Sequence, residues 1–104
     1  MTDPSNLTGK YILRGHKAVP EPDVIKWGEW FEKADRKVAR TEIDNVKIST
    51  IFLGLDHSFG LGRSLLFETM VFGGSLNEEV DRYTTWEEAV AGHDRMVERV
   101  RHGS

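Results

Sequence analysis

The 104-residue sequence contains no cysteine, which excludes disulfides, thiolate metal sites and cysteine nucleophiles. It has no apolar run of about eighteen residues, so it predicts no membrane-spanning segment. The opening residues MTDPSNLTGK lack both the basic and the apolar region of a secretion signal. Together these absences favour a protein that works inside a cell.

An excess of basic residues is also lacking, because 14 Lys and Arg stand against 17 Asp and Glu and give a net charge of −3. A general nucleic-acid binder needs a basic face that displaces counterions from the phosphates. The basic side chains at positions 33–40 lie among the acidic ones of Glu29, Glu32, Asp35 and Glu42, which is typical of a solvated surface of mixed charge. We therefore expect no general binding to nucleic acid.

The length predicts one domain with a single modest core. Residues 1–9 are polar and predict a flexible N-terminal segment, whereas the Gly-Ser pair at 103–104 is typical of a dipeptide left by cloning. The domain itself is expected to cover residues 10–102. It begins with a short strand at 10–14, and the chain turns at 15–16.

A helix is predicted after a stretch that Pro20 and Pro22 keep extended, with Asp23 placed to accept from free backbone N–H groups. Trp30 lies off the centre of its apolar stripe, so it either borders the core or presents an exposed aromatic ring. An exposed Trp30 would be a partner-binding anchor, since tryptophan is common among interface hot spots. The stripe, at helical spacing, consists of Val24, Trp27, Phe31 and Ala34.

Two strands at 38–43 and 46–55 are rich in β-branched and aromatic residues. The Asp-Asn pair at 44–45 suits a two-residue turn, because both residue types tolerate positive φ. Such a turn fixes the register and places Glu42 opposite Lys47, which brings opposite charges together. The other predicted pairs are Ile43 with Val46, Thr41 with Ile48 and Arg40 with Ser49.

Residues 51–55 and 65–72 are apolar at successive positions, which predicts central strands that are covered on both faces. A polar loop at 73–80 then leads to a possible edge strand at 81–84.

The last predicted element is a helix through Arg101 that begins with a capping box, in which Thr85 and Glu88 satisfy free N–H groups. Gly92 inside it costs about 1 kcal/mol relative to alanine, so another element is expected to approach closely there. The buried face is predicted to hold Trp86, Ala89, Val90, His93, Met96, Val97 and Val100. The whole pattern predicts an α+β domain: an antiparallel meander of about four strands, with one helix before it and one C-terminal helix packed on it.

The segment 56–64 joins two predicted strands and is longer than the loop of about two to five residues that a plain hairpin needs. Asp56 and His57 begin it at the end of a rigid strand, where functional side chains are common. A histidine beside a carboxylate can act as a general base or bind a metal. The structural alternative is that Asp56 makes an Asx turn and His57 closes the strand end.

The middle of this loop, GLGRS at 60–64, resembles a phosphate-cradling loop only loosely, because it lacks a P-loop lysine and precedes a strand. Its two glycines more often mean that a tight loop takes positive φ. Arg63 can pair with a phosphate or carboxylate, and Phe59 can stack on a base. The sequence therefore predicts a loop that binds a ligand or partner without a cofactor, through Asp56, His57, Phe59, Gly60, Gly62 and Arg63.

Glu68 and His93 are polar residues on otherwise apolar faces. If the last helix packs on that side of the sheet, they would hydrogen-bond and shift each other's pKa. Together with His57 they would also supply the two histidines and one glutamate of a metal site. The sequence has no HExxH motif to support such a site, so a buried polar pair that stabilises the fold is favoured.

Five segments carry a resemblance: KWGEWF at 26–31, DRKVART at 35–41, STIFLGLDH at 49–57, LLFETMVF at 65–72, and YTTWEE at 83–88 followed by Gly92-His93. Together they resemble a family of small uncharacterised proteins encoded by tailed phages and prophages, over positions 11–101. That family has no assigned chemistry, so no catalytic residue is carried over. The chain departs from the pattern at 61–64, where a loop richer in proline and glycine is expected, and this weakens the case for Arg63.

The resemblance implies a protein in the cytoplasm of a bacterial host, where small acidic phage proteins without enzyme motifs often inhibit host machinery. The first hypothesis is a non-enzymatic binding protein, a counter-defence factor that inhibits a host immune effector or sequesters a nucleotide signal. The second is a structural or scaffold protein of the virion. Independently of function, pairing across an open strand edge would make a symmetric homodimer. The third is a small metal-dependent or acid/base enzyme that uses Asp56, His57, Glu68 and His93.

Overall fold

A computed structural model of the chain describes residues 8–103. Residues 1–7 of the predicted flexible segment and Ser104 of the predicted cloning dipeptide lie outside the described residues. Within the described part, no helix combines the length and the apolar character needed to cross a membrane. The elements are β1 Tyr11–Arg14, β2 Lys17–Pro20, α1 Val24–Lys33, β3 Lys37–Ile43, β4 Val46–Phe52, β5 Phe67–Phe72, β6 Val80–Tyr83 and α2 Trp86–Gly103.

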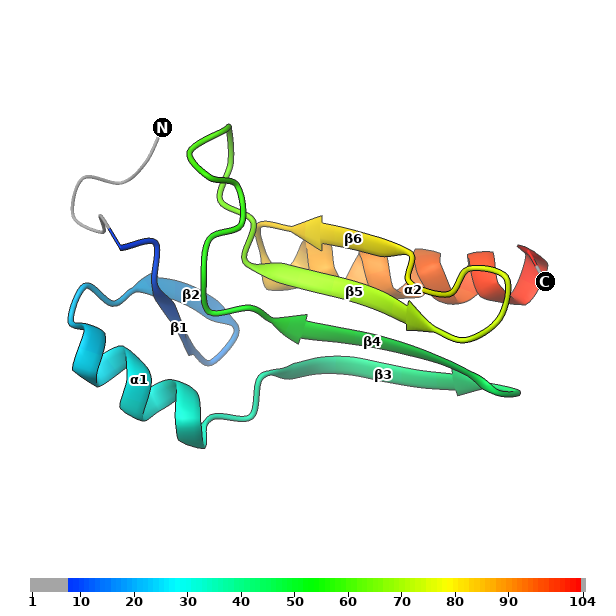
Figure 1. The fold of residues 1–104 in the computed structure, drawn as a ribbon, viewed down its shortest axis with the longest axis horizontal. Coiled ribbons are helices and arrows are strands. Elements are labelled where there is room, and N and C mark those ends of the chain that lie inside the picture. The colour runs from blue at the N-terminus through cyan, green and yellow to red at the C-terminus, as the bar shows by residue number, and fades with distance from the viewer. Residues whose placement is uncertain (1–7, 104) are drawn as a thin grey trace.

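The centre of the fold is a four-stranded antiparallel sheet in the order β3-β4-β5-β6. Helix α2 runs along one face of this sheet, while α1 and the β1-β2 hairpin lie together at the end where β4 finishes (Figure 1). The structure confirms the predicted α+β meander, with a helix before it and a C-terminal helix packed on it. It also contains the β1-β2 hairpin, whose first strand and turn were predicted but whose second strand was not.

The β3-β4 hairpin has the predicted register, including the opposed Glu42 and Lys47. Asp44 takes a φ of 53°, as a two-residue turn at this position requires. The charges pair differently, however: Glu42 binds Arg40 of its own strand at 2.6 Å, and the Lys47 ammonium lies 4.6 Å from the centre of the Phe72 ring. Turn chemistry and side-chain alternation therefore specify this register without a Glu42–Lys47 ion pair.

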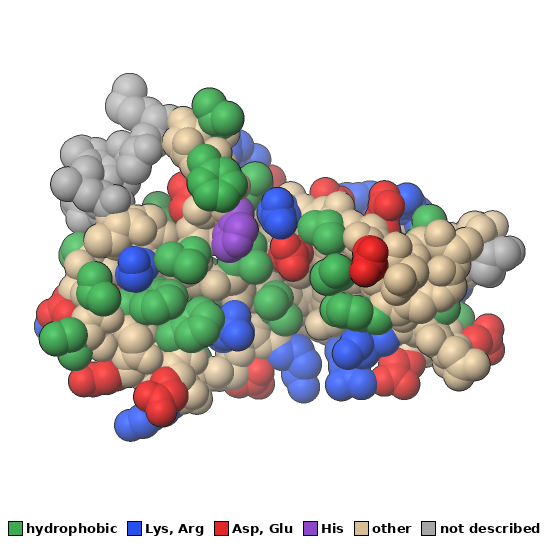
Figure 2. All heavy atoms as spheres, viewed as in Figure 1, with side chains coloured by type: hydrophobic (Ala, Val, Ile, Leu, Met, Phe, Trp, Pro, Cys, Tyr) green, Lys and Arg blue, Asp and Glu red, His purple; other side chains and the backbone are tan. Residues whose placement is uncertain are grey.

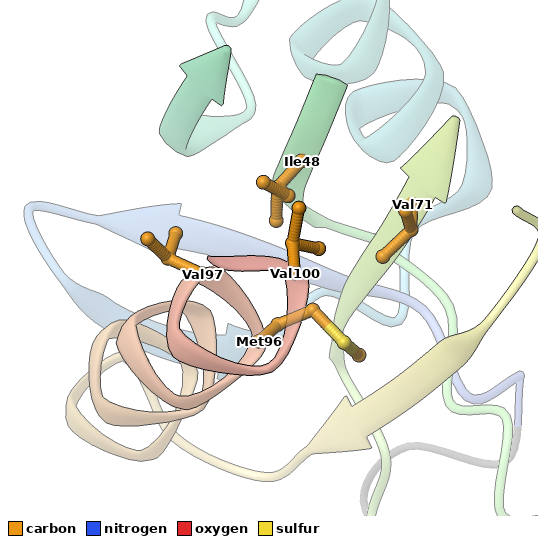
Figure 3. Close-up of a cluster of buried hydrophobic side chains, with 5 residues drawn as sticks. All are labelled: Ile48, Val71, Met96, Val97 and Val100. Atoms are coloured by element: carbon orange, nitrogen blue, oxygen red, sulfur yellow. The ribbon is translucent and has the colours of Figure 1, made fainter. Parts of the chain in front are cut away.

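The core lies between α2 and the inner face of the sheet, in two clusters. In the first, Ile48 of β4 and Val71 of β5 pack against three side chains of α2 (Figure 3). Those three are Met96, Val97 and Val100. The second cluster lies toward α1 and consists of Phe52, Leu66, Phe67, Tyr83 and Ala89.

Gly92 allows α2 to approach β6. A Cβ at this position would lie 2.2 Å from ring atoms of Tyr83, well inside van der Waals contact. The predicted close approach at Gly92 is therefore confirmed, and it explains why a helix interior holds a residue of poor helix propensity.

Helix α1 begins at Asp23, whose carboxylate accepts from two backbone N–H groups of the first turn, as predicted. The indole of Trp27 ties α1 to the rest of the fold. The Nε1–H donates to the carbonyl of Tyr11 at 3.1 Å and to that of Gly54 at 3.0 Å. These bonds hold together α1, the first strand and the chain that leaves β4.

The predicted buried stripe of α1 is partly wrong. Val24 is 53% exposed and no residue of α1 is fully buried, because α1 packs on the small hairpin and the end of the sheet and not across a sheet face. Of the two alternatives for Trp30, the structure supports the first: it is half-buried and borders the core, with its ring edge-on to Phe52.

The prediction that β4 and β5 are covered on both faces is also wrong. Helix α2 covers one face, and on the other Phe72 and Val80 are each 40% exposed while Ile51 and Met70 are half-buried. Figure 2 shows this open face, where hydrophobic side chains are bordered by charged ones. On α2 itself, Val90 was predicted to be buried but is 40% exposed.

Candidate functional site

The loop between β4 and β5 projects beyond the end of the sheet (Figure 1). Its two arms are hydrogen-bonded at the base: Leu53 N–H donates to Leu66 O at 2.7 Å, and His57 N–H donates to Leu65 O at 3.0 Å. The base therefore continues the pairing of the two strands, and the segment 57–64 above it is the projecting part. We refer to residues 56–64 as the recognition loop.

Asp56 braces the recognition loop from inside. Its Oδ1 accepts the N–H of Ser58 at 2.8 Å and the N–H of Leu65 at 3.0 Å, which joins the start of the loop to its end. Burial raises the pKa of Asp56, but these hydrogen bonds outweigh burial and leave the pKa below its ordinary value. The Asx turn expected under the structural alternative is thus confirmed.

His57 closes the end of the strand, again as the structural alternative predicted. Its Nδ1–H donates to the carbonyl of Leu55 at 2.9 Å, which leaves Nε2 as the nitrogen without the hydrogen in a neutral ring. The ring lies tilted toward that of Phe59, with 6.4 Å between centroids. His57 therefore connects the braced base of the loop to its aromatic tip.

The tip of the recognition loop presents two large apolar side chains, Phe59 and Leu61, each 83% exposed. A tight turn positions them, because Leu61 N–H donates to Ser58 O at 3.0 Å and Ser58 is buried. The φ of Phe59 is 55°, in the left-handed region, and both predicted glycines, Gly60 and Gly62, also have positive φ. Figure 2 shows hydrophobic side chains standing out from this loop above the sheet.

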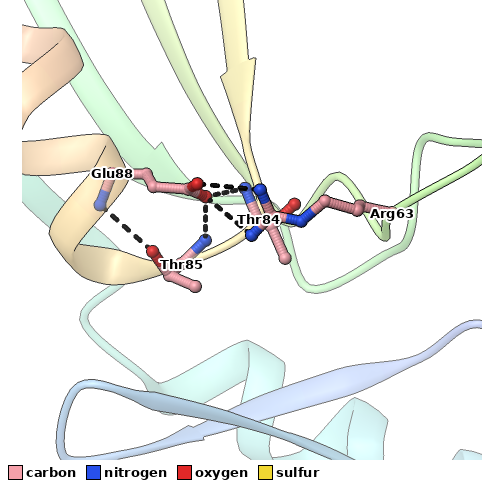
Figure 4. A network of polar contacts seen from close by, with 4 residues as sticks. All are labelled: Arg63, Thr84, Thr85 and Glu88. Carbon is pink, nitrogen blue, oxygen red and sulfur yellow. Dashed lines mark hydrogen bonds and ion pairs between the residues drawn. The ribbon is translucent and has the colours of Figure 1, made fainter.

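Arg63 fixes the returning arm of the loop to α2 (Figure 4). Its two terminal nitrogens bind the two carboxylate oxygens of Glu88 at 2.9 and 3.3 Å. Glu88 also accepts the N–H groups of Thr84 and Thr85, and its own N–H donates to Thr85 Oγ1, so the predicted capping box is present. The Arg63 guanidinium, followed by these backbone N–H groups, holds the pKa of Glu88 below its ordinary value. Arg63, predicted to bind a phosphate or a carboxylate, is thus paired with a carboxylate of its own chain.

The predicted contact between Glu68 and His93 is wrong, because the two residues lie on opposite sides of the sheet. Thr69 points toward α2, so the adjacent Glu68 points to the open face. There Glu68 accepts from Arg82 at 3.0 Å. The alternation within β5 was predicted correctly, but the contact was conditional on α2 packing on the Glu68 side of the sheet, and α2 packs on the other side.

His93 belongs to a buried polar network beneath α2. Its Nε2 lies 2.9 Å from Thr41 Oγ1 and its Nδ1 lies 2.7 Å from Thr50 Oγ1. Thr50 continues the chain of hydrogen bonds to Thr69, which accepts from the Tyr83 hydroxyl at 3.1 Å. Burial lowers the pKa of His93, and each polar atom of the network has a partner. Such a network stabilises one packing arrangement of helix and sheet.

The structure does not bring together the residues of the predicted metal or acid/base site. Within residues 8–103 no three His, Asp or Glu side chains converge so that they could hold a metal ion. His57 lies in the recognition loop, Glu68 on the open face and His93 under α2. The disfavoured alternative of a metal site with two histidines and a glutamate is therefore contradicted for the described residues.

A groove of about 650 Å³ lies next to the recognition loop and was missed by the sequence analysis. Its walls come from the β1-β2 hairpin, the returning arm of the loop and the start of α2. Arg14 and Lys17 line it, and His16 stacks flat on Trp86 at 3.8 Å with 4° between the rings. The signal available in the sequence was the pair of cations on either side of Gly15-His16, which a two-residue turn places opposite each other.

Comparison of the chain with protein-family models, with curated proteins and with solved structures finds no match. The resemblance to phage proteins therefore stays a prediction.

Proposed function

We propose that this chain is a non-enzymatic binding protein that recognises a partner protein through the recognition loop. The observation that carries the proposal is the pair of side chains at the loop tip, Phe59 and Leu61, each 83% exposed on a braced support. Single exposed apolar residues are ordinary, but two large ones only two positions apart in a projecting loop are the kind of feature that an interface buries.

Folding does not account for this tip. The left-handed φ of Phe59 costs about 1 kcal/mol for a bulky residue, and its exposed ring gains almost no burial in return. Backbone strain of this kind is found at sites where the surrounding structure holds a side chain in position for function.

The support under the tip reduces the entropy cost of binding. Asp56 joins the two arms of the loop, and Arg63 ties the returning arm to α2. A loop already held in one conformation loses less freedom when a partner binds, so more of the contact energy appears as affinity. An aromatic ring on a rigid support is therefore suited to be an interface anchor.

The resemblance to phage proteins makes host machinery the class of partner that we propose, and inhibition of a host immune effector the consequence. The virion-scaffold alternative also requires a protein partner, and it is favoured if the chain is found in purified virions. An acid/base or metal enzyme draws no support from Asp56, His57, Glu68 and His93, since their side chains are engaged in separate structural contacts.

The test compares protein capture from a lysate of the bacterial host by three tagged forms of the chain. The double variant Phe59→Ser/Leu61→Ser removes the tip, and Ile25→Ser is the matched control because Ile25 is 73% exposed on α1. We expect the wild type and the control to enrich the same protein at least tenfold over the tip variant. Equal capture by all three forms, or capture by none, would contradict the proposal.

A further inference from the structure

The groove beside the hairpin has the size and the kind of lining that a small-molecule site needs. Its volume of about 650 Å³ falls within the range of ligand pockets, which is roughly 300–1,000 Å³. Its walls combine aromatic rings, from Tyr11 and Trp86, with a few polar groups, among them Ser64 and Thr85. Ligand sites are typically built in this way, from apolar surface with a small number of orienting polar groups.

Two cationic residues of the hairpin line this groove. Arg14 and Lys17 are directly opposite each other in the β1-β2 pairing, on either side of the turn. Like charges at opposed positions destabilise a hairpin. Neither side chain forms an ion pair with another described residue, although the groove lining includes one carboxylate, that of Glu87. An anion bound between Arg14 and Lys17 would turn this repulsion into two attractions.

A flat aromatic surface lies next to these cations. The indole of Trp86 is held edge-on against Phe67 in the core, with 6.3 Å between ring centroids. Its outer face is covered by the imidazole of His16, an exposed residue of the turn, in parallel stacking. The imidazole thus occupies the position that the planar ring of a ligand would take, on a turn whose residues 14–17 are all exposed.

We propose that this groove binds a small anionic ligand with a planar ring, of the nucleotide class. The phosphate lies between Arg14 and Lys17, and the base stacks on Trp86 in place of the His16 imidazole. Charge-assisted hydrogen bonds to phosphate are stronger than neutral ones, and stacking of a base on an aromatic side chain adds to the affinity.

This inference does not depend on the proposed function, because the groove and the loop tip use different side chains. The Phe59→Ser/Leu61→Ser variant leaves Arg14, Lys17 and Trp86 unchanged. A variant of Arg14 and Lys17 likewise leaves Phe59 and Leu61 unchanged. Failure of either proposal is therefore seen separately from failure of the other.

The test is isothermal titration of the full chain with the four ribonucleoside 5′-monophosphates, and with inorganic phosphate and adenosine as the two halves of one of them. We expect saturable binding of at least one nucleotide, at least tenfold tighter than either half. The variant Arg14→Ala/Lys17→Ala should bind it at least tenfold more weakly. The control Lys26→Ala/Lys37→Ala, which removes the same charge from exposed positions elsewhere, should bind like the wild type.

A further variant tests the place of the ring. His16→Ala uncovers Trp86, so it should bind the nucleotide as tightly as the wild type or more tightly. Weaker binding by His16→Ala would overturn the stacking arrangement. No saturable binding at millimolar nucleotide, or equal binding by the Arg14→Ala/Lys17→Ala variant and the wild type, would overturn the site itself.

Discussion

Arg63 of the recognition loop and Glu88 of α2 form a bidentate ion pair, with N–O distances of 2.9 and 3.3 Å. The same carboxylate accepts the backbone N–H groups of Thr84 and Thr85 at the start of the helix. One side chain therefore caps α2 and holds the returning arm of the loop. The position of the loop is coupled to the end of the helix.

This coupling predicts unequal effects at the two ends of the ion pair. Glu88→Ala removes the carboxylate half of the capping box and the brace, and we expect it to lower the free energy of unfolding by about 1–2 kcal/mol. Arg63→Ala removes only an exposed ion pair and should cost less than about 1 kcal/mol. Denaturant unfolding of both variants measures the difference. Equal losses in the two variants would contradict a dual role for Glu88.

Gly92→Ala should destabilise the fold even though alanine is the better helix former. The new Cβ would collide with the Tyr83 ring, and overpacking of this kind costs about 1–3 kcal/mol. The exposed neighbour gives the matched comparison, because Ala91→Gly should cost about 1 kcal/mol from helix propensity alone. Thermal unfolding measures both variants, and a higher melting temperature for Gly92→Ala would show that α2 does not approach β6 as described.

The burial of His93 predicts a dependence of stability on pH. Its pKa is lowered in the folded state, so the unfolded chain takes up the proton first, near the ordinary value of about 6.5. The contribution of neutral His93 is therefore fully present above about pH 6.5 and is lost as the pH falls toward the lower folded pKa. His93→Gln cannot titrate, so its free energy of unfolding should fall less between pH 7.5 and pH 5.5. Identical pH profiles for variant and wild type would refute this assignment.

Asp56→Asn should preserve the brace between the two arms of the loop, whereas Asp56→Ala should remove it. Asparagine keeps an oxygen that can accept the N–H groups of Ser58 and Leu65, whereas alanine leaves both N–H groups without that acceptor. We expect amide hydrogen exchange at these two residues to be at least tenfold faster in Asp56→Ala than in Asp56→Asn. Exchange that is equally fast in both variants would mean that the carboxylate does not brace the loop.

Local chemistry allowed much of the fold to be predicted. The two residues of the turn at 44–45 fixed four residue pairs, and the alternation along 65–72 correctly separated the two faces of β5. The capping box and Gly92 also carry their information within one short segment. In each case the residues that decide the structure are near one another in the sequence.

The errors concern relations between distant segments. The contact of Glu68 with His93 was expected because both break apolar patterns, but alternation alone does not reveal which face a helix covers. The prediction that Val24 is buried was wrong for a similar reason, because α1 packs on a hairpin whose second strand was not predicted. That strand ends in a proline, which argues against a strand when the sequence is read alone. The groove is formed by three segments that only the tertiary fold brings together.

The most direct test of the recognition loop is a hydrogen-exchange footprint of the chain bound to the protein that it captures. We expect amides 57–63 to gain protection in the complex, while those of the exposed edge strand β6 exchange as in the free chain. Unchanged exchange in the loop, with new protection on β6 or on the open face of the sheet, would show that the partner does not bind through the loop.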